Sequence, residues 1–491
     1  MASQAKIVAS LTSKPEPEAL RRLSGLADML EVRADLVGEV DPDWLREHFR
    51  GELLYTLRSR AEGGGSEASP QRRRQRLAQA ASRYDLVDLE GKRDAHPELL
   101  DQVPPRQRIL SWHGPPADLS QLHSVLEVLT AHEARYYKVV PEARQAHDEL
   151  FPLALLHSLR RDDLIAFATG PIGSWTRLIA PRLGAAVVFA SAGHEAAAPG
   201  QLSVGVLRED YGLPDLAPVG QLFGVVGCPV AHSVSPRLHN GLYRLLGLEA
   251  LYLPFHVEAF GDYWLEVVES GSLPELGFEL KGLSVTAPHK EVALAVAGAS
   301  SPLAERIGSA NTLVCNQGVW EAETTDPEGV LGPLRSRGWS PRGKTVAVLG
   351  AGGAGRAAAF ALSQGGATVC LVNRDAERGQ RVSLELALEP LSWGDFEPRR
   401  FDLVVHATPL GLAEADETPF DASGLRRDAV VMDLVYRKEG PTRLVREARE
   451  RGCTTVDGRE VLLAQAMPQF RLMTGREMPA GPARQLLDLA G

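Results

Sequence analysis

The first 215 residues alternate between short apolar runs and amphipathic stretches at fairly even intervals. The apolar runs lie at 6–11, 29–36, 53–58, 86–90, 108–113, 136–140, 164–169 and 185–190. Stretches with helical spacing lie between most of them, at 16–27, 70–83, 116–131 and 174–184. Eight strands that alternate with helices over roughly 210 residues predict a (β/α)8 barrel.

Charged and polar residues gather where these predicted strands end, and such a barrel carries its functional groups at the carboxyl ends of its strands. The residues are Glu31, Arg33, Arg58, Glu62, Glu90, His113, Lys138 and Arg177. Core packing explains so many charges poorly, so the pattern predicts a polar site at this end of the barrel.

Lys138 lies inside an otherwise apolar strand, Tyr136–Val140. Its amine could reach water at the end of the strand, or it could stay buried and attack a ketone as a Schiff-base nucleophile. The second role needs a neutral amine, so burial and the neighbouring arginines must lower a pKa that is ordinarily about 10.4. His113 alone would be an ordinary packed histidine, but beside a lysine and Glu62 it is a candidate general base.

A segment rich in proline and glycine, 211–220, has no periodicity and is predicted to be a linker. A strand at 221–227 follows it, and three later β-runs are expected to end in polar groups. These groups lie at 284–290, 307–312 and 324–326. Ser233 and Ser235 could cap a helix that begins near Pro236, but capping leaves at least one hydroxyl without a role.

The most specific pattern lies at 345–356, with the sequence TVAVLGAGGAGR. A β-branched run, a glycine turn and an alanine-rich helical stretch form the context of a dinucleotide-binding fingerprint. The turn lets the backbone approach a pyrophosphate at the helix N-terminus. It consists of Gly350, Ala351, Gly352, Gly353, Ala354 and Gly355. Further β-runs at 367–372, 402–406, 429–434 and 453–457 predict a doubly wound domain.

The second strand of this domain ends in Asn373 and Arg374, and 373 − 350 = 23 residues separate Asn373 from the first glycine. Sites for NAD usually carry an acidic residue near this position. An asparagine–arginine pair suits a 2′-phosphate instead, so the pattern predicts NADP(H). A simple turn is the alternative, and Asp375 is an unfavourable charge beside a phosphate.

Composition narrows the class of protein. The chain has 491 residues and a net charge of 53 − 63 = −10, so nucleic acid and acidic membranes are not expected as partners. Its four cysteines are far apart and show no metal-ligand spacing, so we expect no metal site and a reduced, cytoplasmic protein. The N-terminus shows no targeting segment. The basic run Arg72–Arg74 with Arg76 is expected to be a solvated helix face. The oligomeric state stays open.

Residues 1–210 resemble type I 3-dehydroquinate dehydratases. The resemblance rests on Glu31-Val-Arg33, Thr56-Leu-Arg58, Glu62-Gly-Gly64, Ser111-Trp-His113, Lys138, Arg177 and Ala198-Pro-Gly-Gln201. It implies that Lys138 forms an imine with the C3 ketone, that His113 moves the C2 proton, and that Glu62 orients His113. It also implies that Arg177 holds the substrate carboxylate. The remaining site residues would be Glu31, Arg33, Arg58 and Gln201.

Residues 221–491 resemble the shikimate dehydrogenase family, through the polar segments named above and the loops at 407–411 and 433–436. The resemblance implies that Lys290 and Asp326 form the catalytic pair. Substrate-binding residues would be Ser233, Ser235, Ser284, Thr286, Asn311, Tyr436 and Gln465. Besides the glycine turn, the cofactor would contact Asn373, Arg374, Arg378, Thr408 and Gly458. His406 stands where the family usually has asparagine.

The two resemblances together predict a bifunctional enzyme of the shikimate pathway with α/β architecture. The dehydratase barrel would span 1–215 and the substrate-binding domain 221–335, with returning helices at 461–491. The Rossmann-type NADP domain would span 336–460. Two alternatives are an NAD-dependent quinate/shikimate dehydrogenase in the second half and a non-catalytic metabolite-binding regulator. The regulator should have lost catalytic groups, which this chain keeps.

Overall fold

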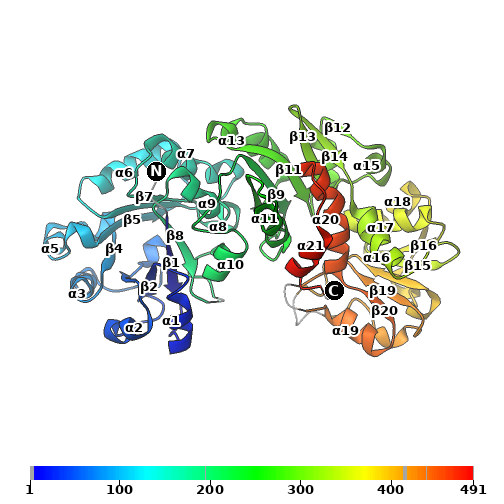
Figure 1. The fold of residues 1–491 in the computed structure, drawn as a ribbon, viewed down its shortest axis with the longest axis horizontal. Helices are drawn as coiled ribbons and strands as arrows, with labels where there is room; N and C mark the ends of the chain where they lie inside the picture. The colour runs from blue at the N-terminus through cyan, green and yellow to red at the C-terminus, as the bar shows by residue number, and fades with distance from the viewer. Residues whose placement is uncertain (1–4, 194, 413–416, 438–439, 490–491) are drawn as a thin grey trace. The chain divides into compact units, whose positions relative to one another are not determined.

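The computed structural model describes residues 5–193, 195–412, 417–437 and 440–489 (Figure 1). The first four residues, part of the stretch in which no targeting segment was expected, lie outside these ranges. The chain forms two compact units. The first holds residues 1–221 and 249–279, and the second holds residues 222–248 and 280–491.

The first unit contains the eight predicted strands, in one parallel sheet with the order β7-β6-β5-β4-β3-β2-β1-β8. They are β1 (Lys6–Leu11), β2 (Met29–Arg33), β3 (Glu52–Thr56), β4 (Leu86–Glu90), β5 (Arg108–Gly114), β6 (Tyr136–Pro141), β7 (Leu164–Ala166) and β8 (Val187–Ser191). The backbone N–H of Ala186 donates to the carbonyl of Leu164 at 2.9 Å, which brings the two edge strands together. The predicted (β/α)8 barrel is therefore confirmed, as a nearly closed one.

The helices around this barrel are short. The longer ones are α1 (Pro17–Leu23), α2 (Pro42–His48), α3 (Pro70–Ala81), α6 (Leu119–Thr130), α7 (Phe151–Leu159) and α10 (Val204–Glu209). Four helices have only four residues each: α4 (Gly91–Asp94), α5 (Pro97–Leu100), α8 (Gly170–Gly173) and α9 (Thr176–Ile179). Alternate strand residues such as Val8, Leu54 and Ile165 fill the barrel interior.

Residues 249–279 pack in the same unit as the barrel. They form β10 (Ala250–His256), α12 (Phe260–Tyr263), a π-helical turn (Trp264–Val268) and α13 (Ser272–Glu275). Trp175 meets Phe255 edge to face, with ring centroids 5.2 Å apart. His147 Nδ1 lies 2.9 Å from Glu266 Oε2. These contacts join residues on both sides of the predicted domain boundary near 215–221, which itself stays a prediction.

The second unit begins with a mixed sheet in which β9 (Gln221–Gly227), β11 (Glu279–Val285), β13 (Thr312–Asn316), β14 (Val319–Glu323) and β12 (Ala299–Ser300) follow one another. Strand β13 pairs antiparallel with both β11 and β14. The helices of this unit outside its second sheet are α11 (Ser235–Leu246), α14 (Lys290–Val296), α15 (Pro302–Ile307), α16 (Asp326–Ser336), α20 (Gly458–Thr474) and α21 (Ala480–Leu486).

The second sheet of this unit is parallel and has the order β17-β16-β15-β18-β19-β20. Its strands are β15 (Thr345–Leu349), β16 (Thr368–Val372), β17 (Glu389–Leu391), β18 (Leu403–His406), β19 (Val430–Asp433) and β20 (Thr454–Val456). Helices α17 (Gly353–Gln364), α18 (Ala376–Glu385) and α19 (Arg443–Glu450) connect them. The strand order reverses between β15 and β18, so the predicted doubly wound domain is confirmed.

One basic residue of the run at 72–76 is not solvated, which corrects the sequence prediction. Arg73 is 2% exposed. Its Nε and Nη2 donate to the two carboxylate oxygens of Asp94 at 2.7 and 2.6 Å, and its Nη1 donates to the carbonyl of Leu57. The guanidinium reaches past its own helix to the end of β3, so helical periodicity alone could not place it.

We expect Asp94→Ala to lower the free energy of unfolding by about 3–5 kcal/mol, because it leaves a buried guanidinium without its main partner. Arg74→Ala is the matched control, since Arg74 faces the exposed Glu98 at 3.8 Å and should cost about 0–1 kcal/mol. Urea denaturation, with dehydratase activity as the measure of folded protein, gives the free energy of unfolding of both variants. Equal losses for the two variants would contradict the buried pair.

A search of the described ranges finds no helix with the length and hydropathy needed to cross a bilayer.

Candidate active sites

A cavity of about 520 Å³ opens at the carboxyl ends of the barrel strands. All eight candidate site residues of the barrel line it: Glu31, Arg33, Arg58, Glu62, His113, Lys138, Arg177 and Gln201. These residues come from six strands and the loops that follow them, and parallel strands deliver their ends to one face of a barrel. The structure thus brings these eight residues together, whereas Glu90, which the strand-end pattern also included, is not among the residues that line the cavity.

Lys138 is 4% exposed, and its Nζ lies 3.7 Å from the centroid of the Phe189 ring. Burial is the main reason that the pKa of this amine falls to about 8, and Arg58 and Arg33 lower it further. Asp88 and Glu31 oppose the shift. A tenth of such amines are neutral at pH 7, against about 0.04% for an ordinary lysine. The site therefore favours the neutral amine, which is the form that could act as a nucleophile.

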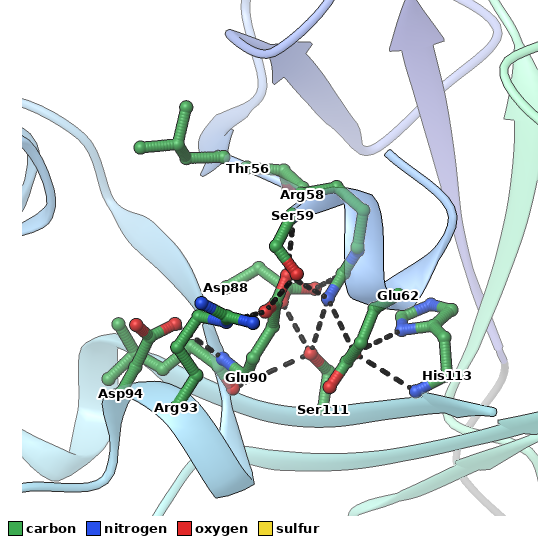
Figure 2. Close-up of polar contacts among 12 residues, drawn as sticks. Thr56, Arg58, Ser59, Glu62, Asp88, Glu90, Arg93, Asp94, Ser111 and His113 are labelled. Atoms are coloured by element: carbon green, nitrogen blue, oxygen red, sulfur yellow. Dashed lines mark hydrogen bonds and ion pairs between the residues drawn. The ribbon is translucent and has the colours of Figure 1, made fainter. Parts of the chain in front are cut away.

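His113 is held by Glu62 through two contacts (Figure 2). Glu62 Oε2 accepts from the backbone N–H of His113 at 3.0 Å and lies 3.2 Å from ring atom Nδ1. Burial and then the charge of Arg58 keep the pKa of His113 well below its usual 6.5, so the ring is neutral and can accept a proton. Burial also raises the pKa of Glu62 to about 8.

Arg58 is the centre of the polar network drawn in Figure 2. Its Nη1 donates to Ser111 Oγ at 2.9 Å and lies 3.2 Å from Glu62, while Nη2 lies 2.9 Å from Asp88 Oδ2. In the barrel site, the sequence analysis missed Asp88, whose Oδ2 lies 3.7 Å from Lys138 Nζ. Burial opposes ionisation of Asp88, but Arg58 and Lys138 outweigh it and lower its pKa.

A signal for Asp88 existed in the sequence. Asp88 and Glu90 stand two apart in one apolar strand, so both point to the same face of it. Glu90 instead holds the loop that follows β3, because its carboxylate accepts from the backbone N–H and the hydroxyl of Ser59 at 2.7 Å each.

The three predicted arginines differ in what neutralises them. Arg33 forms two hydrogen bonds with Asp35, at 2.9 and 2.7 Å, and Arg58 has the carboxylates just described. Arg177 has no ion-pair partner among the described residues; it lies over the Phe167 ring at 4.6 Å, and its buried Nε has no hydrogen-bond acceptor. Burial lowers the pKa of Arg177 to about 10. A buried cation without a counter-charge is a receptor for an anion.

Glu31 and Gln201 also line the cavity. Glu31 accepts from the hydroxyls of Ser10 and, at 2.7 Å, Thr56. The side-chain oxygen of Gln201 accepts from the backbone N–H of Ala197 at 2.8 Å. Both side chains are buried and held in place before any substrate binds.

The second unit brings Lys290 and Asp326 into contact, with 2.5 Å between Nζ and Oδ2. They are 8% and 6% exposed. Asn311 Nδ2 donates to the other oxygen of Asp326 at 2.9 Å and to Thr325 Oγ1 at 3.0 Å. An ammonium held by an oriented carboxylate can deliver a proton to a developing alkoxide.

Two details of this site differ from the sequence prediction. Asn311 does not end a strand, since it precedes β13; it still reaches the site because β13 runs antiparallel to β11, and the start of one meets the end of the other. Ser284 donates to Gln469 Oε1 at 2.7 Å, and Gln469 Nε2 donates to the carbonyl of Asn311 at 3.0 Å. Gln469 was missed because it comes from α20, more than 150 residues away.

The glycine turn forms a close-packed cradle after β15. A Cβ atom on Gly355 would lie 1.9 Å from the carbonyl oxygen of Gly350, and one on Gly350, whose φ is +115°, would lie 2.8 Å from the carbonyl oxygen of Ala407. A Cβ on Gly353 would lie 2.9 Å from two carbons of Lys290. The turn therefore fits a pyrophosphate at the start of α17, with the lysine alongside.

The predicted 2′-phosphate contacts are only partly available. Asn373 Oδ1 accepts from the N–H of Ala351 at 3.1 Å, which ties the end of β16 to the glycine turn. Arg374 is exposed. Arg378 donates to Glu291 at 2.9 Å, so this guanidinium is already paired.

Four more candidate residues of this unit have defined contacts or packing. The Tyr436 hydroxyl contacts Ser233, and Ser233 Oγ accepts from the N–H of Ser235 at 3.2 Å. Ser235 is buried and begins α11 without capping it by its side chain. Gly458 packs so tightly that a Cβ would lie 2.3 Å from the carbonyl oxygen of Val435.

The last three have different surroundings. Thr286 and Gln465 are half-buried, and Thr408 lies two residues after the end of β18. The roles of all these residues stay predictions.

A barrel with an enclosed amine and a doubly wound domain with a buried lysine–aspartate pair beside its glycine turn define an enzyme with two active centres on one chain. Comparisons agree with this class. A family model described as type I 3-dehydroquinase matches residues 7–216, and one described as shikimate dehydrogenase substrate binding domain matches residues 225–313.

The chain is 28% identical over 488 residues to the bifunctional 3-dehydroquinate dehydratase/shikimate dehydrogenase, chloroplastic, of Arabidopsis thaliana, covering 92% of this chain and 78% of the relative. It is 36% identical over 261 residues to the shikimate dehydrogenase (NADP(+)) of Methanothrix thermoacetophila, covering 53% of this chain and 93% of the relative. The crystal structure of shikimate dehydrogenase from Aquifex aeolicus matches with a TM-score of 0.50 and 33% identity, covering 54% and 97% of the two chains.

The chain belongs to the family of bifunctional type I 3-dehydroquinate dehydratase and shikimate dehydrogenase enzymes.

Proposed function

We propose that this chain converts 3-dehydroquinate to 3-dehydroshikimate in its barrel and reduces 3-dehydroshikimate to shikimate with NADPH in its second unit. The observation that carries the proposal is the pair of buried lysines in opposite surroundings. Lys138 has its pKa lowered by burial, whereas Lys290 lies 2.5 Å from a carboxylate. The first suits a nucleophile and the second a proton donor.

In the barrel, Lys138 attacks the C3 ketone and forms an imine, with loss of one water molecule. His113 removes the C2 proton, and the imine accepts the electron pair as an enamine. The C1 hydroxyl then leaves with the proton that His113 returns. Hydrolysis takes up one water molecule and frees Lys138, so the net reaction releases one water molecule. Arg177 holds the substrate carboxylate.

In the second unit, bound NADPH supplies the hydride for the C3 carbonyl carbon. Lys290 donates its Nζ proton to the carbonyl oxygen, and Asp326 and Asn311 keep that ammonium in one orientation. The glycine turn and Asn373 would hold the cofactor, with the exposed Arg374 at the 2′-phosphate. Ser233, Ser235, Ser284, Thr286, Tyr436 and Gln465 would bind the substrate.

A coupled assay tests the proposal. The intact chain with 3-dehydroquinate and NADPH should oxidise NADPH after a lag, and 3-dehydroshikimate should remove the lag. NADH should support a much lower kcat/KM than NADPH. Turnover of quinate with NAD, without turnover of 3-dehydroshikimate, would favour the alternative dehydrogenase. Binding of both metabolites without turnover would favour the regulator.

The dehydratase should depend on pH in one direction. The neutral form of Lys138 is the reactive form, so kcat/KM should rise as pH approaches about 8 and level off above it. Glu62, with a pKa of about 8, ionises over the same range and adds to the rise. The lowered pKa of His113 keeps that ring neutral throughout. A pH–rate profile from pH 6 to 9 measures this, and a maximum near pH 6 would contradict it.

The cytoplasm is the proposed compartment, supported by four free cysteines. The Arabidopsis thaliana relative is named as chloroplastic.

A further inference from the structure

A histidine, an aspartate and a threonine form a chain of contacts at the carboxyl ends of β18 and β19, and the mechanism above uses none of them for proton transfer. His406 ends β18, is fully buried and lies opposite Asp433 in the register of β18 and β19. Its Nδ1 lies 2.9 Å from Asp433 Oδ1, and its Nε2 lies 2.5 Å from Thr408 Oγ1.

Both carboxylate oxygens of Asp433 accept hydrogen bonds from other groups as well. Asp433 Oδ2 accepts from the Thr442 hydroxyl at 2.6 Å, and Oδ1 also accepts from the N–H of Val435 at 3.0 Å. An ionised carboxylate only accepts, so His406 must donate its Nδ1 proton to it. In a ring that carries its one proton on Nδ1, Nε2 has a lone pair, and Thr408 can donate its hydroxyl proton to that atom at 2.5 Å.

Thr408 is therefore left with oxygen lone pairs for any other partner. One of them receives a long contact of 3.4 Å from the N–H of Leu410. Thr408 also borders the glycine turn, because a Cβ on Gly350 would lie 3.2 Å from Thr408 Cγ2. This place, between β15 and β18, is where the strand order reverses and where open α/β sheets bind dinucleotides.

We propose that His406 and Asp433 are positioning residues that make the Thr408 hydroxyl a fixed hydrogen-bond acceptor for the bound dinucleotide. The group it accepts from is an N–H or O–H donor, such as a carboxamide nitrogen or a ribose hydroxyl. The inference deepens the proposed function and rests on it, since it takes NADPH as the cofactor of this unit. Neither positioning residue touches the cofactor in this arrangement.

The decisive variant is His406→Asn. The shorter amide can still donate to Asp433, but it no longer offers an acceptor at the Nε2 position, so Thr408 is free to rotate. We expect the Kd of NADPH to rise about three- to tenfold, the equivalent of one hydrogen bond. Thr408→Val should cause a similar loss. The double variant should bind NADPH within twofold of Thr408→Val alone, because the histidine acts only through that hydroxyl.

Two readouts separate this role from simple packing. The ¹⁵N spectrum of labelled wild-type enzyme should contain one imidazole, absent in His406→Asn, with a protonated Nδ1 and a bare Nε2. Dehydratase activity, which belongs to the other unit, should stay unchanged and shows that the chain is folded. Multiplicative losses in the double variant, an unchanged Kd in His406→Asn, or a protonated Nε2 would each overturn the proposal. Failure of the proposed function itself looks different, because wild-type enzyme would then show no saturable NADPH binding.

Discussion

Replacement of Lys138 by methionine should lower the dehydratase kcat by about 10⁴-fold or more, because no other lysine is among the described residues that line the cavity. Methionine is close to lysine in length and suits a site that is 4% exposed, so the barrel should fold. Arg58 remains as a counter-charge for Asp88 at 2.9 Å. Reduction of 3-dehydroshikimate by the same preparation should be unchanged.

Lys92→Met is the matched control, since Lys92 is an exposed lysine of the same barrel. It should leave both activities unchanged. Borohydride reduction of the wild-type enzyme with 3-dehydroquinate should add the reduced substrate to the peptide that contains residue 138, as measured by mass spectrometry. A label on another lysine, or a Lys138→Met enzyme with a tenth of normal activity, would contradict the assigned nucleophile.

The sequence predicted the barrel cavity well because strand periodicity and topology determine it. Once eight parallel strands are placed, the residues at their carboxyl ends must meet at one face. His113 lies near the end of β5 and Lys138 lies inside β6, whereas Glu62 and Arg177 belong to the segments that follow β3 and β7, and all four line one cavity. The same reasoning identified Lys138 as a buried amine, since a lysine within an apolar strand has few other places to go.

Some contacts could not be predicted from the sequence because long side chains reach residues outside their own helix or strand. Arg73 belongs to a polar-looking helix face, but its guanidinium extends to Asp94 and to the end of β3. Asp88 influences Lys138 from behind the cavity wall. The prediction had burial and neighbouring arginines lower the pKa of Lys138, and burial is indeed the largest cause, with Arg58 and Arg33 adding to it. The prediction did not include Asp88 and Glu31, which raise this pKa.

Contacts between segments that are far apart in the sequence could not be predicted either. Gln469 meets Ser284 across 185 residues of sequence, and no local pattern marks it. Strand β17 has only three residues, includes Pro390 and has largely exposed side chains, so it has no apolar run to detect. In contrast, the glycine turn was predictable because the steric need for glycine at Gly350 and Gly355 is local.

Replacement of Lys290 by alanine should lower the kcat for 3-dehydroshikimate reduction by about 10²–10⁴-fold, because the developing alkoxide loses its proton donor. The Kd of NADPH should change by less than about threefold. Asp326→Asn should cause a smaller loss, since the ammonium stays but its partner at 2.5 Å loses its charge. Dehydratase activity should be unchanged in both variants.

The control for Lys290 is its neighbour. Glu291→Gln removes the exposed contact with Arg378 at 2.9 Å and leaves the proton donor in place, so its kcat should stay near normal. Lys290→Arg keeps a positive charge, but a guanidinium does not release a proton at ordinary pH, so this variant should be nearly as slow as alanine. If Lys290→Arg were active, the charge would matter and the proton would not. If Lys290→Ala raised KM while kcat stayed normal, Lys290 would be a binding residue.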